Sequence, residues 1–517
     1  MKEYDVVIIG GGITGAGTAR DCAMRGLKTL LVERYDLTNG ATGRNHGLLH
    51  SGARYAVSDR ESAAECIKEN KILRRIASHC VEETGGLFIS LPEDDPAYRT
   101  SLVESCLKAG IEAEEIDPAE ALRMEPSANK SLVGAVKVPD ASVDPFMLTS
   151  ANALDATLHG AEILTYHCLN GFIKEGGRIV GVALFDSRRH QEKEIRARIV
   201  VNAAGIWGQQ IASMAGAQIG MYPAKGSLLI FGHRVNKMVI NRCRKPANAD
   251  ILVPGDVVSV IGTTSTKVPF EECDDVRVTS DEVDLLLSEG IKLAPCLGEA
   301  RVLRAYAGVR PLVASDDDPT GRSISRGIVL LDHEFRDGIP GLVSITGGKL
   351  TSYRLMAQDA TDLVCRKLAV DAPCRTAELP LPGSDGLSPA SRLDPIAKKA
   401  ASLRHGSRVA KMDFQGKSEV LCECEHVTRA EIEYAAKYLG VNNLVDLRRR
   451  TRVGMGTCQG AFCAGKVAAA LAEVLGCPEN AENLAREYII ERWKGITPIC
   501  WGESLREAEY MRKRYAK

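Results

Sequence analysis

The N-terminal segment, residues 4–33, contains the pattern that most constrains the fold. A short apolar, β-branched run leads into the glycine-rich stretch 10–15, and a second apolar run ends at Glu33. The glycines have the spacing G-x-G-x-x-G, typical of a strand-to-helix turn that binds a dinucleotide. Glu33 lies 18 residues after Gly15, close to the roughly 20 expected of an acid that binds a ribose diol. A carboxylate there repels a 2′-phosphate, so the segment predicts a βαβ unit for FAD or NAD rather than NADP.

Each glycine of the motif has its own predicted role. Gly10 permits the turn out of the strand, Gly12 lets the backbone approach a pyrophosphate, and Gly15 lets the helix pack on the sheet. The N–H groups of Ile13 to Gly15 then point at the phosphates from the positive end of the helix dipole. A glycine-rich turn in an ordinary α/β unit is the alternative, but it would not require Glu33.

Composition limits the remaining possibilities. A chain of 517 residues exceeds one usual hydrophobic core, so two or three domains are expected. The formal charge is −1 and there is no long basic block, so nucleic acid is not an expected partner. No stretch approaches the roughly 18 apolar residues of a membrane span, and the N-terminal run does not resemble a signal peptide. The sequence therefore predicts a cytoplasmic protein with free thiols.

The segment after Glu33, residues 34–55, is rich in small residues and carries two histidines and three arginines. It cannot build a core, and its glycines let the backbone pass close to a flat or charged group. We expect it to run beneath the pyrophosphate and the flavin ring. The alternative is a flexible surface loop.

Further along, the patterns divide the chain into parts. A strand and two polar helical segments follow residue 86, short strands separated by turns occupy 225–326, and apolar strands end at Ala204-Gly205 and at Gly347-Gly348. We predict an α/β fold with a Rossmann-like nucleotide domain, an antiparallel-sheet substrate domain and a small helical C-terminal domain. The predicted boundaries are a nucleotide part at about 1–80, 136–215 and 327–370, a substrate part at about 81–135 and 216–326, a linker at 371–416, a cysteine-containing domain at 417–476 and a tail at 477–517.

Four of the sixteen cysteines are grouped, at Cys422, Cys424, Cys458 and Cys463. The C-x-C and C-x4-C pairs can supply two thiolates to each iron of a 2Fe-2S cluster. Zinc is the rival, although its ligand pairs usually have the spacing C-x2-4-C; chance clustering is a further alternative. The nearby basic run at 448–452 is expected to form a solvated face, or else to raise the cluster potential or meet an acidic partner.

Four motifs resemble the FAD-dependent glycerol-3-phosphate dehydrogenases, which have the D-amino-acid-oxidase type of fold. They are the opening motif, residues 46–55, AGVRPL at 307–312 and TGGKLT at 346–351, and the resemblance covers about residues 1–370. It implies FAD as cofactor and sn-glycerol 3-phosphate as substrate, oxidised to dihydroxyacetone phosphate. It also implies cofactor contacts at Gly10, Gly12, Ile13, Thr14, Gly15, Glu33, Arg34, Thr42, His46, Gly47, Leu48, Ala204, Gly205, Gly347, Gly348 and Leu350.

The same resemblance implies the catalytic residues. Arg54 and Arg310 would hold the substrate phosphate with Tyr55 nearby, because two guanidinium forks suit a dianion. Lys349 and Thr351 would hold the glycerol hydroxyls. Some relatives carry a histidine directly after Lys-Gly-Ser, but here Leu228 follows residues 225–227. His50 is therefore the candidate base, with a packing role against the flavin and His233 as alternatives.

The cysteine segment resembles the 2Fe-2S domain of the bacterioferritin-associated ferredoxin type, and all four cysteines match. A flavin dehydrogenase with this domain resembles the anaerobic glycerol-3-phosphate dehydrogenases. That implies electron export to quinone through two partners, a second subunit of the complex and a membrane-anchoring iron-sulfur subunit, with the chain peripheral on the inner face of the membrane. The alternatives are a flavin oxidase of glycerol phosphate or an amino acid, and a non-catalytic redox carrier.

Overall fold

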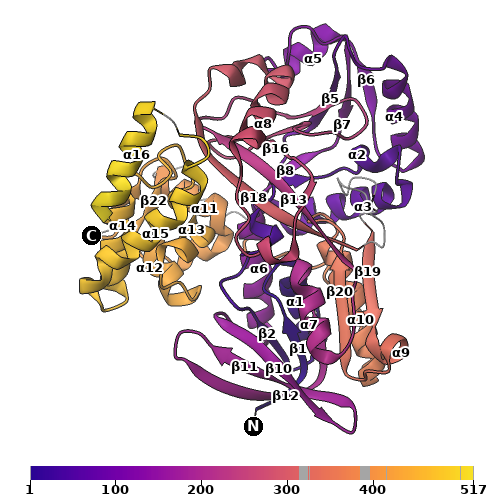
Figure 1. Cartoon of the computed structure of the whole chain (residues 1–517), viewed down its shortest axis with the longest axis vertical. Coiled ribbons are helices and arrows are strands. Elements are labelled where there is room, and N and C mark those ends of the chain that lie inside the picture. Colours follow the sequence, from indigo (N-terminus) through magenta and orange to yellow (C-terminus); the bar gives the residue numbers. More distant parts are fainter. Residues whose placement is uncertain are drawn as a thin grey trace.

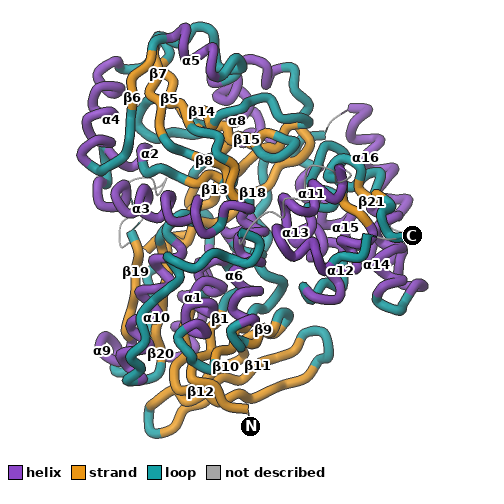
Figure 2. The backbone as a smooth tube through the Cα atoms, turned by 180° about the vertical axis from the view of Figure 1, so that it is seen from behind, coloured by secondary structure: helices purple, strands orange, loops and turns teal. Residues whose placement is uncertain are grey.

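The computed structural model describes residues 2–313, 324, 327–384, 396–414, 416–500 and 502–515. Three parts can be followed in Figure 1: an α/β part around β1, a sheet-rich part around β5 and β13, and a helical C-terminal part on the left. Figure 2 shows the same arrangement from behind. The end of the predicted substrate part and sections of the predicted linker and tail lie outside the described residues.

The α/β part is built on an eight-stranded sheet with a parallel centre in the order β20-β12-β1-β2-β9. The long strand β12 pairs through its first half with the antiparallel hairpin β10–β11, and β19 pairs antiparallel with β20. The strands are β1 (Lys2–Ile9), β2 (Thr29–Val32), β9 (Glu162–Leu164), β10 (His167–Glu175), β11 (Arg178–Asp186), β12 (Gln191–Asn202), β19 (Ile328–Asp332) and β20 (Leu342–Gly347).

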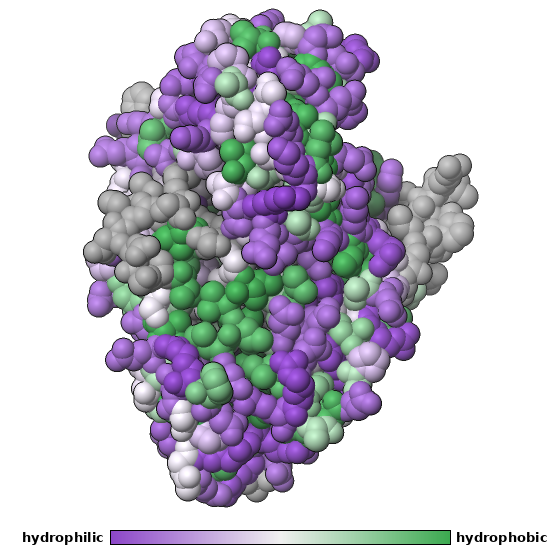
Figure 3. All heavy atoms as spheres, turned by 90° about the vertical axis from the view of Figure 1, so that its right-hand side faces the viewer, coloured by the Kyte–Doolittle hydropathy of each residue, from purple (hydrophilic) through white to green (hydrophobic). Residues whose placement is uncertain are grey.

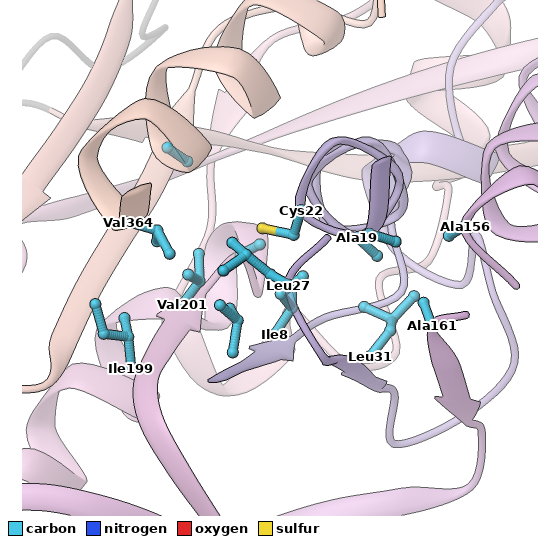
Figure 4. Close-up of a cluster of buried hydrophobic side chains, with 14 of the residues drawn as sticks. Ile8, Ala19, Cys22, Leu27, Leu31, Ala156, Ala161, Ile199, Val201 and Val364 are labelled. Carbon is cyan, nitrogen blue, oxygen red and sulfur yellow. The ribbon is translucent and has the colours of Figure 1, made fainter. Parts of the chain in front are cut away.

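Helices pack on this sheet because its central strands are apolar on both faces. Helix α1 (Ile13–Met24) contacts both α6 (Pro145–Leu158) and α10 (Tyr353–Leu368), and α7 (Gly208–Ala215) follows β12. Figure 4 shows the core between them, where Ile8, Leu31 and Val201 of the strands face Ala19 and Val364 of the helices. This core fixes the start of α1 at the end of β1.

The sheet-rich part has nine strands, in the order β17-β13-β16-β15-β14-β5-β7-β6, with β18 paired to β13. The strands are β5 (Gly86–Ser90), β6 (Glu114–Ile116), β7 (Gly134–Val138), β13 (Met221–Phe231), β14 (Val239–Arg242), β15 (Ile251–Pro254), β16 (Ser259–Gly262), β17 (Thr266–Lys267) and β18 (Val302–Val313). The helices around it are α4 (Pro96–Lys108), α5 (Pro118–Met124) and α8 (Ser280–Leu293).

Two features of this sheet differ from the prediction. The pair β14–β5 is parallel, so the sheet is mixed rather than antiparallel. The chain leaves this part after β7 and re-enters it at β13, and this long crossover makes a parallel pair possible. In addition, β7 pairs with β5 and β6, so the boundary predicted at residue 136 falls inside a strand that stays in this sheet.

The two sheets are joined by short elements after β2. They are β3 (Leu48–Leu49), α2 (Ala53–Ala56), α3 (Arg60–Ile76), β4 (Val81–Glu82) and β8 (Ala141–Val143), with β3, β8 and β4 forming a small sheet. Helix α3 begins where the Asp59 side chain accepts a hydrogen bond from the N–H of Ser62, a stabilising N-cap. The loop predicted to lie under the flavin leads directly into this small sheet.

The C-terminal part is a helical domain with a short hairpin. Its elements are α11 (Ile396–His405), β21 (Val420–Cys422), β22 (Val427–Thr428), α12 (Arg429–Tyr438), α13 (Leu444–Thr451), α14 (Ala464–Val474), α15 (Ala481–Ile496) and α16 (Gly502–Tyr515). Helix α15 also packs on β18: a Cβ atom at Gly495 would lie 2.4 Å from the carbonyl oxygen of Ala305. The domain is therefore in direct contact with the nine-stranded sheet, as Figure 1 shows.

The side of the molecule opposite this domain carries mostly hydrophilic side chains in the view of Figure 3, with a hydrophobic area near the middle. Among the described residues, no helix has both the length and the apolar character needed to cross a membrane.

Candidate functional site

The glycine-rich turn between β1 and α1 has three different packing environments. Gly10 has a positive φ of 115°, and a Cβ atom there would lie 2.6 Å from the carbonyl oxygen of Ala203. At Gly15 a Cβ would lie 1.9 Å from the oxygen of Gly10, so α1 reaches the strand only because residue 15 is glycine. At Gly12 the nearest atom is the Thr42 hydroxyl at 3.2 Å. The turn is thus packed against backbone at Gly10 and Gly15, whereas, among the described residues, the Thr42 hydroxyl is the one neighbour within 4 Å of a Cβ at Gly12, which fits a pyrophosphate bound beside Gly12.

The start of α1 presents backbone N–H donors to the space beside Gly12. No side chain caps the helix at Gly12, and the Thr42 hydroxyl accepts a hydrogen bond of 3.1 Å from the N–H of Ile13. Thr14 lies in the first turn with its hydroxyl 3.9 Å from the Met356 sulfur. Thr42 thus engages the first N–H of the helix, and the N–H groups that follow it, beside the glycines, suit a phosphate.

Glu33 and Arg34 follow β2. The Glu33 carboxylate accepts hydrogen bonds from the N–H groups of Gly11 (2.6 Å) and Tyr35 (2.8 Å), and burial raises its pKa. The carboxylate is therefore held beside the turn, where a ribose diol would reach it. Arg34 instead pairs with Asp274 and lies over the Trp207 ring, 4.4 Å from its centroid.

Several predicted cofactor positions lie at strand ends around the same turn. A Cβ atom at Gly10 would come 2.9 Å from the Cα of Ala204, at the end of β12. Gly47, Gly205, Gly347 and Gly348 all have positive φ values, which favour glycine. Leu48 is buried in β3, and Leu350 packs in the core beneath α6. These positions form a backbone-lined region, a suitable surface for a flat ring.

The predicted catalytic residues come together from two distant segments. The His50 ring centroid lies 6.0 Å from that of His46 and 5.3 Å from that of Tyr55. The ammonium of Lys349 lies 4.8 Å from the Tyr55 centroid, and the N–H of His50 donates to the hydroxyl of buried Thr351 at 3.2 Å. The turn after β20 therefore lies against the start of α2. His233, by contrast, is exposed in the turn after β13.

The charges of both predicted phosphate-binding arginines lower the pKa of His46. The pKa of His46 is lowered to about 3 by burial, and further by the positive charges of Arg310 and Arg54. Arg54 pairs with Asp250 at 3.0 Å, while its buried Nη1 has no hydrogen-bond partner among the described residues. Two guanidinium groups near one imidazole, one with an unused donor, form a site for an anion.

Sequence reasoning missed the groups that orient these arginines. Asp250 is 1% exposed and pairs with both Arg54 and Arg244. Arg310 donates to the Thr263 hydroxyl, to the Thr264 carbonyl at 3.0 Å and to the Ser265 hydroxyl at 3.3 Å. The only available signal was a run of small hydroxyl residues at 263–266 after an apolar strand.

In the Lys-Gly-Ser segment, residues 225–227, the glycine is required by the packing of Arg310. A Cβ atom at Gly226 would lie 2.5 Å from Nη2 of Arg310, so this glycine makes room for the guanidinium. Lys225 pairs with Glu282 at 2.7 Å, and the Ser227 hydroxyl donates to the same carboxylate at 2.9 Å.

The four grouped cysteines meet in the C-terminal domain. The sulfur of Cys424 lies 4.0 Å from that of Cys422 and 3.6 Å from that of Cys458, and Cys463 contacts both Cys422 and Cys458. The pKa of Cys422 is lowered to about 3 by the neighbouring thiols and by the N–H groups of Gly454 and Glu425. At Gly456 a Cβ atom would lie 2.8 Å from the Cys424 sulfur. Thiols that gather with backbone donors around them fit an iron-sulfur cluster.

The arginines of α13 are not a solvated face, so that interpretation was wrong. Arg448, Arg449 and Arg450 are 8%, 8% and 4% exposed. The helix is pressed against the nucleotide part, where Arg449 and Arg450 both pair with Asp36. Nothing in a single sequence distinguishes a charged surface from a charged interface between two domains.

Comparison with known proteins agrees with this arrangement. Residues 5–354 match the family model described as FAD dependent oxidoreductase, and residues 420–473 match the BFD-like [2Fe-2S] binding domain. A solved glycerol-3-phosphate dehydrogenase from Bacillus halodurans, complexed with FAD, has a TM-score of 0.72 and 25% identity, covering 97% of each chain.

Curated relatives match almost the whole chain. The A subunit of the anaerobic glycerol-3-phosphate dehydrogenase of Escherichia coli K12 is 58% identical over 99% of this chain and 96% of its own. Its counterpart in Haemophilus influenzae is 57% identical over 99% and 92%, and the A1 subunit of Haloferax volcanii is 45% identical over 98% and 88%. The chain therefore belongs to the FAD-dependent oxidoreductases and, among them, to the family of anaerobic glycerol-3-phosphate dehydrogenase A subunits.

Proposed function

We propose that the chain oxidises sn-glycerol 3-phosphate to dihydroxyacetone phosphate and exports the electrons through its iron-sulfur domain. The observation that carries this proposal is the pair Arg54 and Arg310 beside His46, with a buried Arg54 nitrogen that has no partner among the described residues. A phosphate dianion suits two guanidinium groups, whereas an amino-acid carboxylate needs one. The names of the curated relatives support the same substrate.

Substrate binding begins at the two arginines. Asp250 fixes Arg54, and the segment 263–265 fixes Arg310, so both forks are oriented before the phosphate arrives. Preorganised donors of this kind lose little entropy on binding. Lys349 and Thr351 would then bind the hydroxyl end of the substrate.

His50 is the proposed base. Its backbone N–H donates to Thr351 and its ring lies beside Tyr55, two residues of the proposed substrate site, which supports this role. His50 would remove the proton of the C2 hydroxyl as the hydride leaves C2. Bound FAD supplies the hydride acceptor. His46, with its pKa near 3, stays neutral and does not compete as a cation for the phosphate.

The Cys422, Cys424, Cys458 and Cys463 thiolates would hold a 2Fe-2S cluster, which supplies one-electron transfer when bound. The relatives are named as one subunit of an assembly. We propose that two partners, a second subunit of the complex and a membrane-anchoring iron-sulfur subunit, carry the electrons to quinone. These partners would also hold this chain on the inner face of the membrane.

Kinetics of Arg310→Ala would test the phosphate site. We expect kcat/KM for glycerol 3-phosphate to fall roughly 100-fold or more, because a hydrogen-bonded ion pair of about 3 kcal/mol is lost. Oxidation of glycerol, which has no phosphate, should change little. Arg123→Gln is the matched control, since Arg123 is a surface residue of α5 with a 76% exposed side chain. An unchanged Michaelis constant for glycerol 3-phosphate in Arg310→Ala would rule out the phosphate-binding role.

A further inference from the structure

A second basic site lies away from the proposed substrate site. A cavity of about 870 Å³ separates the flavin-binding part from the iron-sulfur domain. Its lining includes His46 on one side and Cys424 on the other, but not Arg54, Arg310 or Lys349. The cavity therefore lies between the two redox sites rather than over the substrate residues.

Three arginines from three parts of the fold line this cavity. Arg44 belongs to the loop after β2, Arg304 to β18 and Arg448 to α13. Among the described residues, none of these three side chains has a hydrogen bond or ion pair, and the buried Nε atoms of Arg304 and Arg448 have no partner. Other arginines of α13 are fully engaged, as the pairing of Arg450 with Asp36 shows.

The positive charge of Arg304 acts on both Arg44 and Arg448. Arg448 is 8% exposed, and its pKa is lowered to about 10 by burial and then by the charge of Arg304. Burial and the charges of Arg449 and Arg304 also lower the pKa of Arg44. Two carboxylates, Glu491 and Asp275, act on Arg44 in the opposite sense, and Lys494 pairs with both, at 3.3 Å and 3.5 Å. The cavity thus has a surplus of positive charge in a place where water screens it poorly.

We propose that this cavity binds a phosphate group, as inorganic phosphate or as an organic phosphate monoester, between Arg44, Arg304 and Arg448. Guanidinium forks match the geometry of phosphate oxygens, and three forks suit a dianion. The cavity volume leaves room for an organic group beyond the phosphate. Because each arginine comes from a different part of the fold, the bound anion would join the iron-sulfur domain to the flavin-binding part.

This site is independent of the proposed substrate site, and binding stoichiometry in variants can separate the two. The experiment is equilibrium dialysis of the FAD- and cluster-containing protein with labelled inorganic phosphate. We expect two equivalents of phosphate in the wild type, one at each site, and one equivalent in Arg310→Ala, bound in the cavity. In Arg310→Ala, phenyl phosphate should displace this equivalent at lower concentration than unlabelled phosphate if the natural ligand is an organic ester, and at similar concentration if it is inorganic phosphate.

Variants of the cavity arginines assign the other equivalent. Arg448→Gln and Arg304→Gln should each bind one equivalent, at the proposed substrate site, whereas the control Arg123→Gln should bind two. Two equivalents in both Arg448→Gln and Arg304→Gln, or no phosphate bound by Arg310→Ala, would overturn the proposal. A single equivalent in the wild type that persists in Arg310→Ala and is lost in Arg448→Gln would contradict the substrate site and leave this one intact.

Discussion

Arg450 of the iron-sulfur domain forms a buried, two-point ion pair with Asp36 of the nucleotide-binding part. The contacts are 2.5 Å and 3.1 Å long, and Arg449 adds a third at 3.3 Å. Asp36 lies three residues beyond Glu33, near the start of the segment 34–55 that is predicted to run beneath the flavin. The iron-sulfur domain is thus held against the cofactor loop by charge as well as by packing.

Asp36→Asn should loosen this attachment. Two arginines would lose their carboxylate in a buried place, so we expect the free energy of unfolding to fall by about 3 kcal/mol. We also expect slower electron transfer from flavin to cluster, while flavin reduction by substrate keeps its rate. Denaturant titration measures the first effect and anaerobic stopped-flow absorbance the second.

The control for this prediction is Glu104→Gln, which removes an exposed pair with Lys108 on α4. It should lower the free energy of unfolding by less than about 1 kcal/mol. If Asp36→Asn and Glu104→Gln lower this free energy and slow electron transfer equally, the docking role of Asp36 is refuted.

Gly12→Ala should weaken FAD binding, whereas Gly15→Ala should destabilise the fold. A methyl group at residue 15 would lie 1.9 Å from a backbone oxygen, whereas at residue 12 its nearest neighbour is a hydroxyl at 3.2 Å. We therefore expect Gly15→Ala to lower the melting temperature of the apoprotein strongly. Gly12→Ala should fold but bind FAD weakly, because the methyl group occupies the space of the pyrophosphate. Calorimetry of the apoproteins and FAD titration separate the two, and tight FAD binding by Gly12→Ala would contradict the assigned pyrophosphate position.

The sequence allowed the βαβ unit and the grouping of four cysteines to be predicted, because each has a local pattern. It did not reveal that Asp250 orients Arg54 or that residues 263–265 hold Arg310, since these contacts join segments far apart in the chain. It also misassigned the arginines of α13. Asp36, the partner of Arg449 and Arg450, is more than 400 residues away in the sequence, and a charged helix face looks the same whether it meets water or another domain.

His46 should make stability depend on pH. Its pKa is lowered to about 3 by burial and by Arg310 and Arg54, while the unfolded value is about 6.5. The unfolded chain therefore gains a proton that the folded protein rejects, and stability falls as the pH drops from about 6 towards 3, by up to about 1.4 kcal/mol per pH unit. In denaturant titrations of the apoprotein, His46→Gln should lose about 2 kcal/mol less than wild type between pH 7 and pH 5. The same loss in both proteins would show that His46 is not held in its neutral form.

The most direct test of the proposed reaction is an anaerobic absorbance measurement on the purified protein mixed with glycerol 3-phosphate. We predict loss of the oxidised flavin band followed by bleaching of the iron-sulfur absorption. In Cys458→Ser the flavin band should still bleach, while the cluster absorption is missing from the start; Cys477→Ser, a cysteine outside the group, should behave as wild type. A flavin band that does not respond to glycerol 3-phosphate, with the cofactor bound and the protein folded, would contradict the proposed reaction.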